Sequence, residues 1–244
     1  MSASVRLHKY IANCGYCSRR HAELLIAAGL VRVNGATASE PGSALDPRRD
    51  RVTINGEEIT PPPLHTIMLH KPAGFISSTH DTHERLTVMD LLPRTLVHAG
   101  VVPVGRLDLD TFGLLLMTND GELHHRITHP SYECPKEYFV RVQGKIPPQK
   151  VERLARGLLL DDGPTQPVGV LSCEHRGAES ELRVELTEGR KREVKRMFAT
   201  LGHEVSYLKR LRIGPLALGD LPVGAWRELT GEELAAIRRA CGLR

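Results

Sequence analysis

The sequence of 244 residues lacks the long apolar segments that characterise membrane and secreted proteins. No stretch approaches the roughly 18 consecutive apolar residues of a membrane-spanning helix, and no long apolar segment of the signal-peptide type stands at the N-terminus. We therefore expect a cytoplasmic protein with no membrane partner. Aromatic residues make up only 4% of the chain, against 41% for all hydrophobic residues. The core should therefore consist mainly of Leu, Val and Ala.

The chain also lacks a disulfide framework and a complete metal-binding motif. Five cysteines are too few and too scattered to brace a chain of this length. Cys14 and Cys17 have the spacing of zinc ligands, but no second Cys pair or spaced His pair completes a site. We expect no metal, no cofactor and a reducing compartment.

Positive charge is concentrated in two windows, although the net charge is only +4. Residues 5–35 carry five Lys or Arg and one acidic residue, and residues 189–212 carry eight Lys or Arg and two acidic residues. The remaining chain is therefore net acidic. Such a separation of charge is typical of a protein that binds nucleic acid.

Local signals divide the chain into two domains. In the first 60 residues, Ser18 is a suitable N-cap for a helix that runs to Ala28, and Asn34-Gly35 and Asn55-Gly56 are hairpin turns. Three prolines at 61–63 then favour an extended spacer. The sequence predicts a domain at 1–60, a proline-rich linker at 61–65 and a second domain at 66–244.

The most informative stretch is GRLDLDTFGLLLMTNDG at residues 105–121. Leu114 to Met117 is a short apolar run typical of a strand that is buried on both faces. Residues 119–121 are turn residues that tolerate positive φ. Arg106, Asp108 and Asp110 crowd three charges beside this strand, and a buried carboxylate needs a partner or a function.

This stretch resembles the active-site signature of the RsuA/RluB-type ribosomal RNA pseudouridine synthases, GRLDxxTxGLLLxTNDG. The resemblance implies that Asp108 is the catalytic residue. The alternative is an ordinary aspartate at a turn, paired with Arg106. Phe112 departs from the pattern, because a smaller residue usually stands there.

Two further motifs follow in the order that the family has. KEYFV at 136–140 resembles the family's KxYxV, which implies that Tyr138 stacks on the target base; the alternative is a core tyrosine. GRKREVKRM at 189–197 is similar to GRxxQVxRM, which implies that Lys195 pairs with Asp108. Glu193 departs from the expected Gln, so the role of that position is open.

The N-terminal run RLHKYIANCGYCSRRHAELLIAAGLVRVNG is similar to an S4 domain, a small module that binds structured RNA through phosphates. The alternative is a solvated basic helix pair. His124, His125 and His129 have no chemical role in the family and are interpreted as RNA-facing or structural. The predicted RNA-binding residues are Arg6, Lys9, Arg19, Arg20, Arg32, Arg106, Arg190, Lys191, Arg192 and Arg196.

The resemblance implies an α+β fold, in which a small S4 domain precedes a catalytic domain with a long mixed, mostly antiparallel sheet flanked by helices. It implies a monomeric ribosomal RNA pseudouridine synthase that needs no cofactor, with Asp108, Tyr138 and Lys195 as catalytic residues. We favour the large-subunit RNA without a physical argument. Two alternatives stay open: a non-catalytic S4-type ribosome-assembly factor, and a nucleotide-sugar transferase that uses Asp108 and Asp110 as a DxD metal site.

Overall fold

The computed structural model describes residues 4–243, which form two compact units. The first unit comprises the chain up to His65 with residues 93–101 and 119–121, and the second comprises the rest. Residues 59–65, which include the three prolines, contain no helix or strand. The domain limits 1–60, 61–65 and 66–244 stay a prediction. Among the described residues, no helix is long and apolar enough to cross a bilayer.

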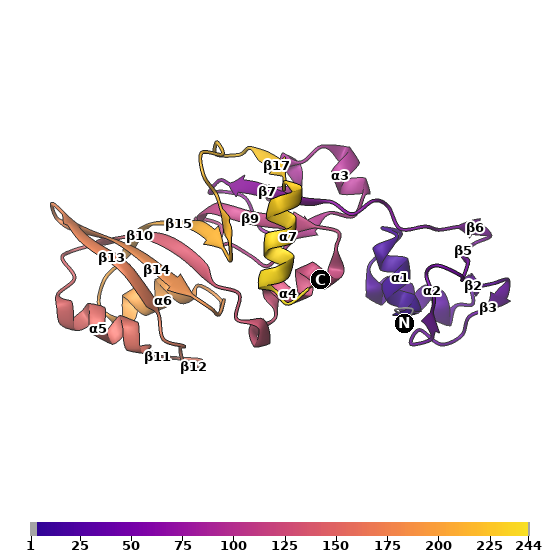
Figure 1. The fold of residues 1–244 in the computed structure, drawn as a ribbon, viewed down its shortest axis with the longest axis horizontal. Helices are drawn as coiled ribbons and strands as arrows, with labels where there is room; N and C mark the ends of the chain where they lie inside the picture. The colour runs from indigo at the N-terminus through magenta and orange to yellow at the C-terminus, as the bar shows by residue number, and fades with distance from the viewer. Residues whose placement is uncertain (1–3, 244) are drawn as a thin grey trace. The chain divides into compact units, whose positions relative to one another are not determined.

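Short helices and strands make up the first unit (Figure 1). They are α1 (Leu7–Asn13), α2 (Arg19–Ala27), α3 (Arg94–His98), β1 (Val5–Arg6), β2 (Val31–Val33), β3 (Ala36–Thr37), β4 (Ala44–Leu45), β5 (Val52–Ile54) and β6 (Glu57–Glu58). Four of the strands form an antiparallel sheet in the order β3-β2-β5-β6. Ser18 caps α2, because its hydroxyl accepts a hydrogen bond from the His21 amide at 3.2 Å. Both Asn-Gly turns have the predicted positive φ, 53° at Asn34 and 53° at Asn55.

A nine-stranded sheet dominates the second unit. Its strands are β7 (Thr66–Lys71), β8 (Val102–Pro103), β9 (Phe112–Thr118), β10 (Lys136–Gln143), β13 (Gly169–Arg176), β14 (Glu179–Leu186), β15 (Val205–Ile213), β16 (Leu216–Ala217) and β17 (Trp226–Glu228). The main order is β13-β14-β10-β15-β9-β7-β17. Only β9 and β15 pair in parallel among these described strands. The predicted mixed, mostly antiparallel sheet is confirmed.

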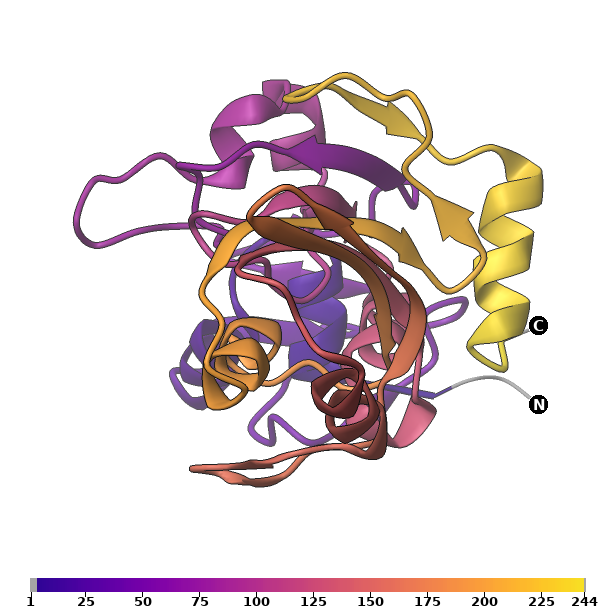
Figure 2. The ribbon, with the colours of Figure 1, turned by 90° about the vertical axis from the view of Figure 1, so that its left-hand side faces the viewer.

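Helices and a small hairpin flank this sheet. They are α4 (Gly121–Thr128), α5 (Pro148–Arg156), α6 (Glu193–Thr200), α7 (Gly231–Ala240), the 3-10 helices η1 (Val88–Leu91) and η2 (Pro130–Tyr132), and the hairpin strands β11 (Leu159–Leu160) and β12 (Gly163–Pro164). Figure 2 shows the strands around β10 and β14 curving over α5 and α6, which lie on one face of the sheet. The α6 helix contacts β15, which pairs with β9.

An interior strand of the sheet, β9, contains one glycine that allows its parallel neighbour β15 to approach. Leu114 to Met117 are fully buried, as the apolar run predicts. Gly113 pairs with Arg210 of β15. It has a φ of 113°, and a Cβ there would lie 2.2 Å from the Arg210 carbonyl oxygen. Only glycine is compatible with this contact.

The turn after β9 differs from the predicted one. None of the three described residues 119–121 has φ in the left-handed region, and Gly121 begins α4. The Asn119 side chain holds the turn instead. Its amide oxygen accepts from the His65 amide at 2.7 Å, and its amide nitrogen donates to the carbonyl oxygens of Pro63 and Ala99, both at 2.9 Å.

Candidate active site

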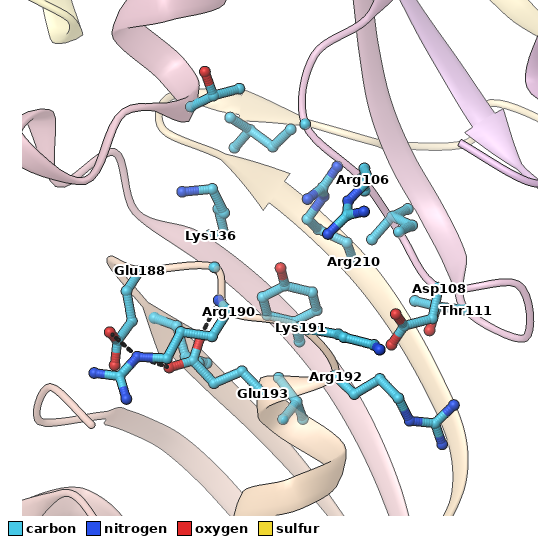
Figure 3. Close-up of a pocket in the computed structure, with 18 of the residues that line it drawn as sticks. Arg106, Asp108, Thr111, Lys136, Glu188, Arg190, Lys191, Arg192, Glu193 and Arg210 are labelled. Carbon is cyan, nitrogen blue, oxygen red and sulfur yellow. Dashed lines mark hydrogen bonds and ion pairs between the residues drawn. The ribbon is translucent and has the colours of Figure 1, made fainter. Parts of the chain in front are cut away.

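A cavity of about 500 Å³ in the second unit brings distant parts of the sequence together (Figure 3). Its walls come from residues 104–111, the end of α4, β10, residues 186–194 and β15. The predicted site residues that line it are Arg106, Asp108, Tyr138, Arg190, Lys191 and Arg192. The first two predicted motifs therefore meet in one cavity, together with part of the third.

Asp108 is half-buried and lies on a turn whose backbone is held by hydrogen bonds from Lys71 and Ser77. The ammonium of Lys71, at the end of β7, donates to the carbonyl oxygens of Asp108 at 3.1 Å and of Thr111 at 3.0 Å. The Ser77 hydroxyl donates to the Leu107 carbonyl at 3.0 Å, and the Leu107 amide lies 3.1 Å from the same hydroxyl. These hydrogen bonds restrain the backbone of the turn. They therefore fix the position from which the Asp108 side chain extends.

Lys71 is a buried cation beneath this turn that the sequence analysis did not single out. It is fully buried. Burial lowers its pKa to about 8, the carboxylates of Asp110 and Asp108 act in the opposite direction, and Arg210 lowers it further. The available signal was a lysine at the end of a strand with an apolar centre, because a buried cation needs hydrogen-bond acceptors. Here the acceptors are mainly the carbonyls of the Asp108 turn.

Tyr138 and Arg210 face the cavity from neighbouring strands. They are directly opposite each other in the β10–β15 pairing, immediately after an irregularity at Glu137. Residues opposite each other in an antiparallel pair project to the same face of the sheet. Both line the cavity, with exposed fractions of 8% and 3%. Arg210 was not among the predicted site residues, because its buried position between Lys209 and Leu211 leaves no trace in the sequence pattern.

The predicted pairing of Lys195 with Asp108 is wrong in this structure. The Lys195 ammonium instead contacts the carboxylate of Asp110. Asp108 lines the cavity and Asp110 does not, so α6 meets the outer carboxylate of the turn. Asp108 and Asp110 therefore have different surroundings, which disagrees with a shared DxD metal site. Figure 3 shows the Lys191 side chain extending toward Asp108.

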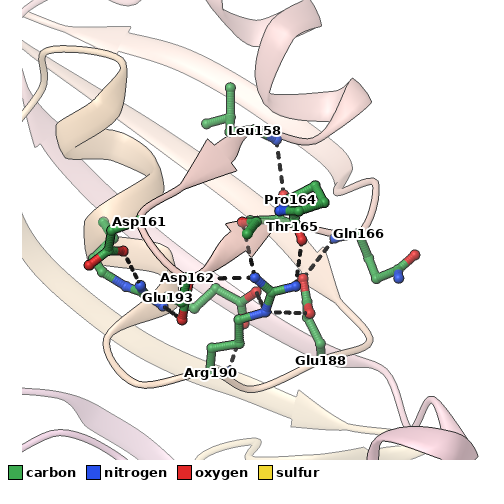
Figure 4. A network of polar contacts seen from close by, with 11 residues as sticks. Leu158, Asp161, Asp162, Pro164, Thr165, Gln166, Glu188, Arg190 and Glu193 are labelled. Atoms are coloured by element: carbon green, nitrogen blue, oxygen red, sulfur yellow. Dashed lines mark hydrogen bonds and ion pairs between the residues drawn. The ribbon is translucent and has the colours of Figure 1, made fainter.

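Two predicted RNA-binding arginines are held by carboxylates of the protein, and Figure 4 shows the contacts of one of them, Arg190. Arg190 Nε donates to Glu188 Oε2 at 2.9 Å, and its Nη1 lies 3.4 Å from Asp162 Oδ1. Arg196 pairs with Asp161 at 2.6 Å and with Asp162 at 2.9 Å. The turn between β11 and β12 thus anchors Arg190 and Arg196. Arg190 and Arg196 are engaged within the protein, and their contact with RNA stays a prediction.

Glu193 behaves like the glutamine that the family pattern has at this position. It is 4% exposed, and its Oε2 accepts a hydrogen bond from the Arg190 amide at 3.0 Å. Burial raises its pKa to about 7, and the nearby Glu188 carboxylate acts in the same direction. A protonated Glu side chain is neutral and offers both a donor and an acceptor, as Gln does. Below neutral pH a protonated Glu193 therefore offers the same kinds of hydrogen-bonding group as the expected Gln.

The second departure from the family pattern is Phe112, whose ring packs against an aromatic neighbour, and the predicted RNA-binding residues in the first unit are mostly exposed. Phe112 stacks on Tyr207 with ring centroids 5.2 Å apart, so its size is used in packing. In the first unit, the side chains of four of the five predicted RNA-binding residues are exposed, and Lys9 is half-buried. Arg19 Nη2 lies 3.0 Å from His8 Nε2.

Comparisons with known proteins agree with the sequence motifs. Residues 65–200 match the family model described as RNA pseudouridylate synthase, and residues 5–50 match that of the S4 domain. The chain is 40% identical to "Ribosomal large subunit pseudouridine synthase B" of Bacillus subtilis, over 96% of this chain and 95% of that protein. It is 39% identical to "Uncharacterized RNA pseudouridine synthase" of Aquifex aeolicus, over 98% and 96%.

A solved structure supports the fold over nearly the whole chain. It is described as "Crystal structure of pseudouridylate synthase" and shares 32% identity. The match covers 96% of this chain and 100% of that one, with a TM-score of 0.69. The predicted family is thereby confirmed, and the chain belongs to the RNA pseudouridylate synthases, with an S4 domain preceding the part that matches the enzyme family.

Proposed function

We propose that this protein isomerises a specific uridine of large-subunit ribosomal RNA to pseudouridine, with Asp108 as the catalytic residue. The large-subunit assignment rests on the name of the Bacillus subtilis relative, which matches this chain end to end. The observation that carries the catalytic assignment is the meeting of Asp108 and Tyr138 in one cavity lined by cations. We place the enzyme in the cytoplasm as a monomer.

The reaction breaks the N1–C1′ bond of uridine, turns the uracil and joins its C5 to C1′, after which C5 loses its proton. An ionised Asp108 can attack C1′ as a nucleophile or remove the C2′ proton to give a glycal. Tyr138 stacks on the uracil and keeps it in the cavity while it turns. Lys195 supports the reaction as a positioning residue, because it holds Asp110 on the turn that carries Asp108.

Cations around the cavity and on the S4 domain bind the RNA. The exposed side chains of Arg106, Lys191 and Arg192 line the cavity, where they can contact the phosphates beside an extruded uridine. Extrusion costs a few kcal/mol, which these contacts offset. Arg6, Lys9, Arg19, Arg20 and Arg32 supply phosphate contacts that depend on the shape of the RNA more than on its sequence.

Mapping pseudouridines in ribosomal RNA tests this function. Cells that lack the protein should lose one pseudouridine or a small set of them from the large-subunit RNA, and wild-type protein should restore the loss. Restoration by an Asp108→Asn variant would favour a different catalytic residue. An unchanged map together with defective ribosome assembly would favour the assembly factor.

A further inference from the structure

Arg210 is a buried cation whose hydrogen-bonding capacity is only partly used. Its Nε donates to the Leu114 carbonyl at 2.7 Å, which ties β15 to β9. Its Nη2 is buried and has no hydrogen-bond partner among residues 4–243. An unpaired buried donor, above all a charged one, costs free energy. The Nε bond explains why Arg210 is structural, but it does not explain the two terminal nitrogens.

The surroundings of Arg210 at the cavity are mostly positive. Arg106 and Lys136 line the same cavity, and Figure 3 shows Arg106 and Arg210 on the same side of it. Burial lowers the pKa of Lys136, and the Arg210 charge lowers it further. The Thr111 hydroxyl, also at this cavity, is buried without a partner in the described chain. The part of the cavity around Arg210 can therefore bind a hydrogen-bond acceptor or an anion that the substrate supplies.

RNA can bring two such groups, a phosphate or the carbonyl oxygens of the base. The exposed cations Arg106, Lys191 and Arg192 are placed for phosphates. Arg210 is 97% buried and lies opposite Tyr138 on the neighbouring strand. If Tyr138 stacks on the uracil, the residue beside it reaches the edge of the base. The base is therefore the better candidate.

We propose that Arg210 is a further catalytic residue, which donates hydrogen bonds to a carbonyl oxygen of the uracil and stabilises the negative charge that forms there when the N1–C1′ bond breaks. This inference rests on the proposed function of Asp108 and Tyr138. By either route, the electron pair of the N1–C1′ bond leaves with the uracil. The charge spreads to the carbonyl oxygens and disappears when C5 bonds to C1′. C5 then loses its proton, and N1 gains one. No oxidant or reductant takes part.

A fixed donor aimed at a developing charge lowers the barrier more than it strengthens ground-state binding. Removing one such donor typically slows a reaction about 10²–10³-fold. Arg210→Gln is the suitable variant, because the Gln amide nitrogen can occupy the place of Nε and keep the bond to Leu114. The change removes only the charge and the two terminal nitrogens.

The test uses the full-length protein and an rRNA fragment that carries uridine or 5-fluorouridine at the mapped position. Fluorine withdraws electrons and makes the uracil anion a better leaving group. Single-turnover cleavage, followed as loss of the N1-linked nucleoside at saturating enzyme, should slow about 10²–10³-fold with uridine in Arg210→Gln. With 5-fluorouridine the loss should be at least about tenfold smaller, while RNA affinity stays within about threefold.

Arg212→Gln is the matched control. Arg212 lies on the same strand, but its Nε lies 3.8 Å from Glu137 Oε2 and it does not line the cavity. The cleavage rates of the Arg212→Gln variant should therefore be unchanged on both substrates. If Arg210→Gln does not fold, Arg210→Lys gives the same comparison between the two substrates. Equal losses on uridine and 5-fluorouridine, or a loss confined to affinity, would overturn the proposal and favour a structural or phosphate-binding role. If wild-type protein does not convert uridine, the proposed function itself fails.

Discussion

The ammonium group of Lys195 lies against the carboxylate of Asp110, two residues beyond Asp108. Partial burial raises the pKa of Asp110, but the Lys195 ammonium, a backbone hydrogen bond and the Arg192 charge together lower it more, so the pKa lies below its ordinary value. The turn that carries Asp108 is thus tied to α6 through this pair and to β7 through Lys71. We propose that Lys195 acts on the position of Asp108, because it contacts the neighbouring Asp110 carboxylate and not that of Asp108.

A double-mutant cycle distinguishes an effect of Lys195 that passes through Asp110 from a direct effect of Lys195 on the charge of Asp108. If Lys195 acts through Asp110, Lys195→Met and Asp110→Asn should each slow isomerisation by a similar factor, and the double variant should be no slower than either. The Asp110 side chain is 59% exposed, so the Lys195–Asp110 pair should contribute no more than about 1 kcal/mol to the free energy of unfolding. That contribution is present above the ordinary carboxyl pKa and is lost as the pH falls through the lowered pKa of Asp110. A full Lys195→Met effect in the Asp110→Asn background would contradict this account.

The raised pKa of Glu193 should make the stability of the protein fall toward neutral pH. Because its folded pKa is about 7 and its ordinary pKa is about 4.3, its contribution is complete below about pH 4 and declines up to about pH 7. The free energy of unfolding should fall over this range by up to about 3 kcal/mol. Denaturant unfolding of Glu193→Gln should show a flatter pH dependence than wild type.

The exposed carboxylate Glu204 provides the control for Glu193. Glu204→Gln should leave the pH dependence of unfolding as it is in wild type. Since each variant is compared with wild type at the same pH, contributions from other titrating groups cancel. A Glu193→Gln protein with the wild-type pH dependence would show that Glu193 is already ionised in this range.

Gly113→Ala should disrupt the contact between β9 and β15. The added Cβ would lie 2.2 Å from the Arg210 carbonyl oxygen at a φ of 113°, so the two strands must separate. We expect a loss of more than about 3 kcal/mol, measured by denaturant unfolding. Gly231→Ala meets no atom within 4 Å and should stay within about 1 kcal/mol of wild type. Equal stabilities of the two variants would contradict the close approach.

The S4 domain should account for much of the salt dependence of RNA binding. Replacing Arg6, Arg20 and Arg32 by Gln should flatten the slope of log K against log salt by about two to three units, if each contacts one phosphate. The paired change Arg48→Gln and Arg49→Gln removes exposed positive charge from the same unit and should change the slope by less than about one unit. An equal flattening of the salt slope in both variants would indicate that RNA binding depends on the net charge of the unit and not on the positions of Arg6, Arg20 and Arg32.

The sequence was most informative where local chemistry decides the outcome. The Asn-Gly turns, the Ser18 cap and the buried run of β9 were predictable, because each depends on residues close together in the chain. The contacts of Lys195, Arg190 and Arg196 were not. Each of these cations has carboxylates within reach in several segments, and only the packing of α6 against the β11–β12 turn and the Asp108 turn selects the partner. Arg210 was missed for a similar reason, since its burial depends on the irregular pairing of β10 with β15.

The central claim is that Asp108 performs the chemistry in the cavity that Tyr138 shares. The most direct measurement is the single-turnover rate of pseudouridine formation by Asp108→Asn, with Asp110→Asn as the neighbouring control. The Asn side chain keeps the shape but cannot act as the anionic nucleophile or base, so product should fall to background while RNA affinity is retained. Asp110→Asn should be far milder. An Asp108→Asn rate above about one-tenth of wild type would contradict the account, since loss of an essential catalytic group costs far more than tenfold.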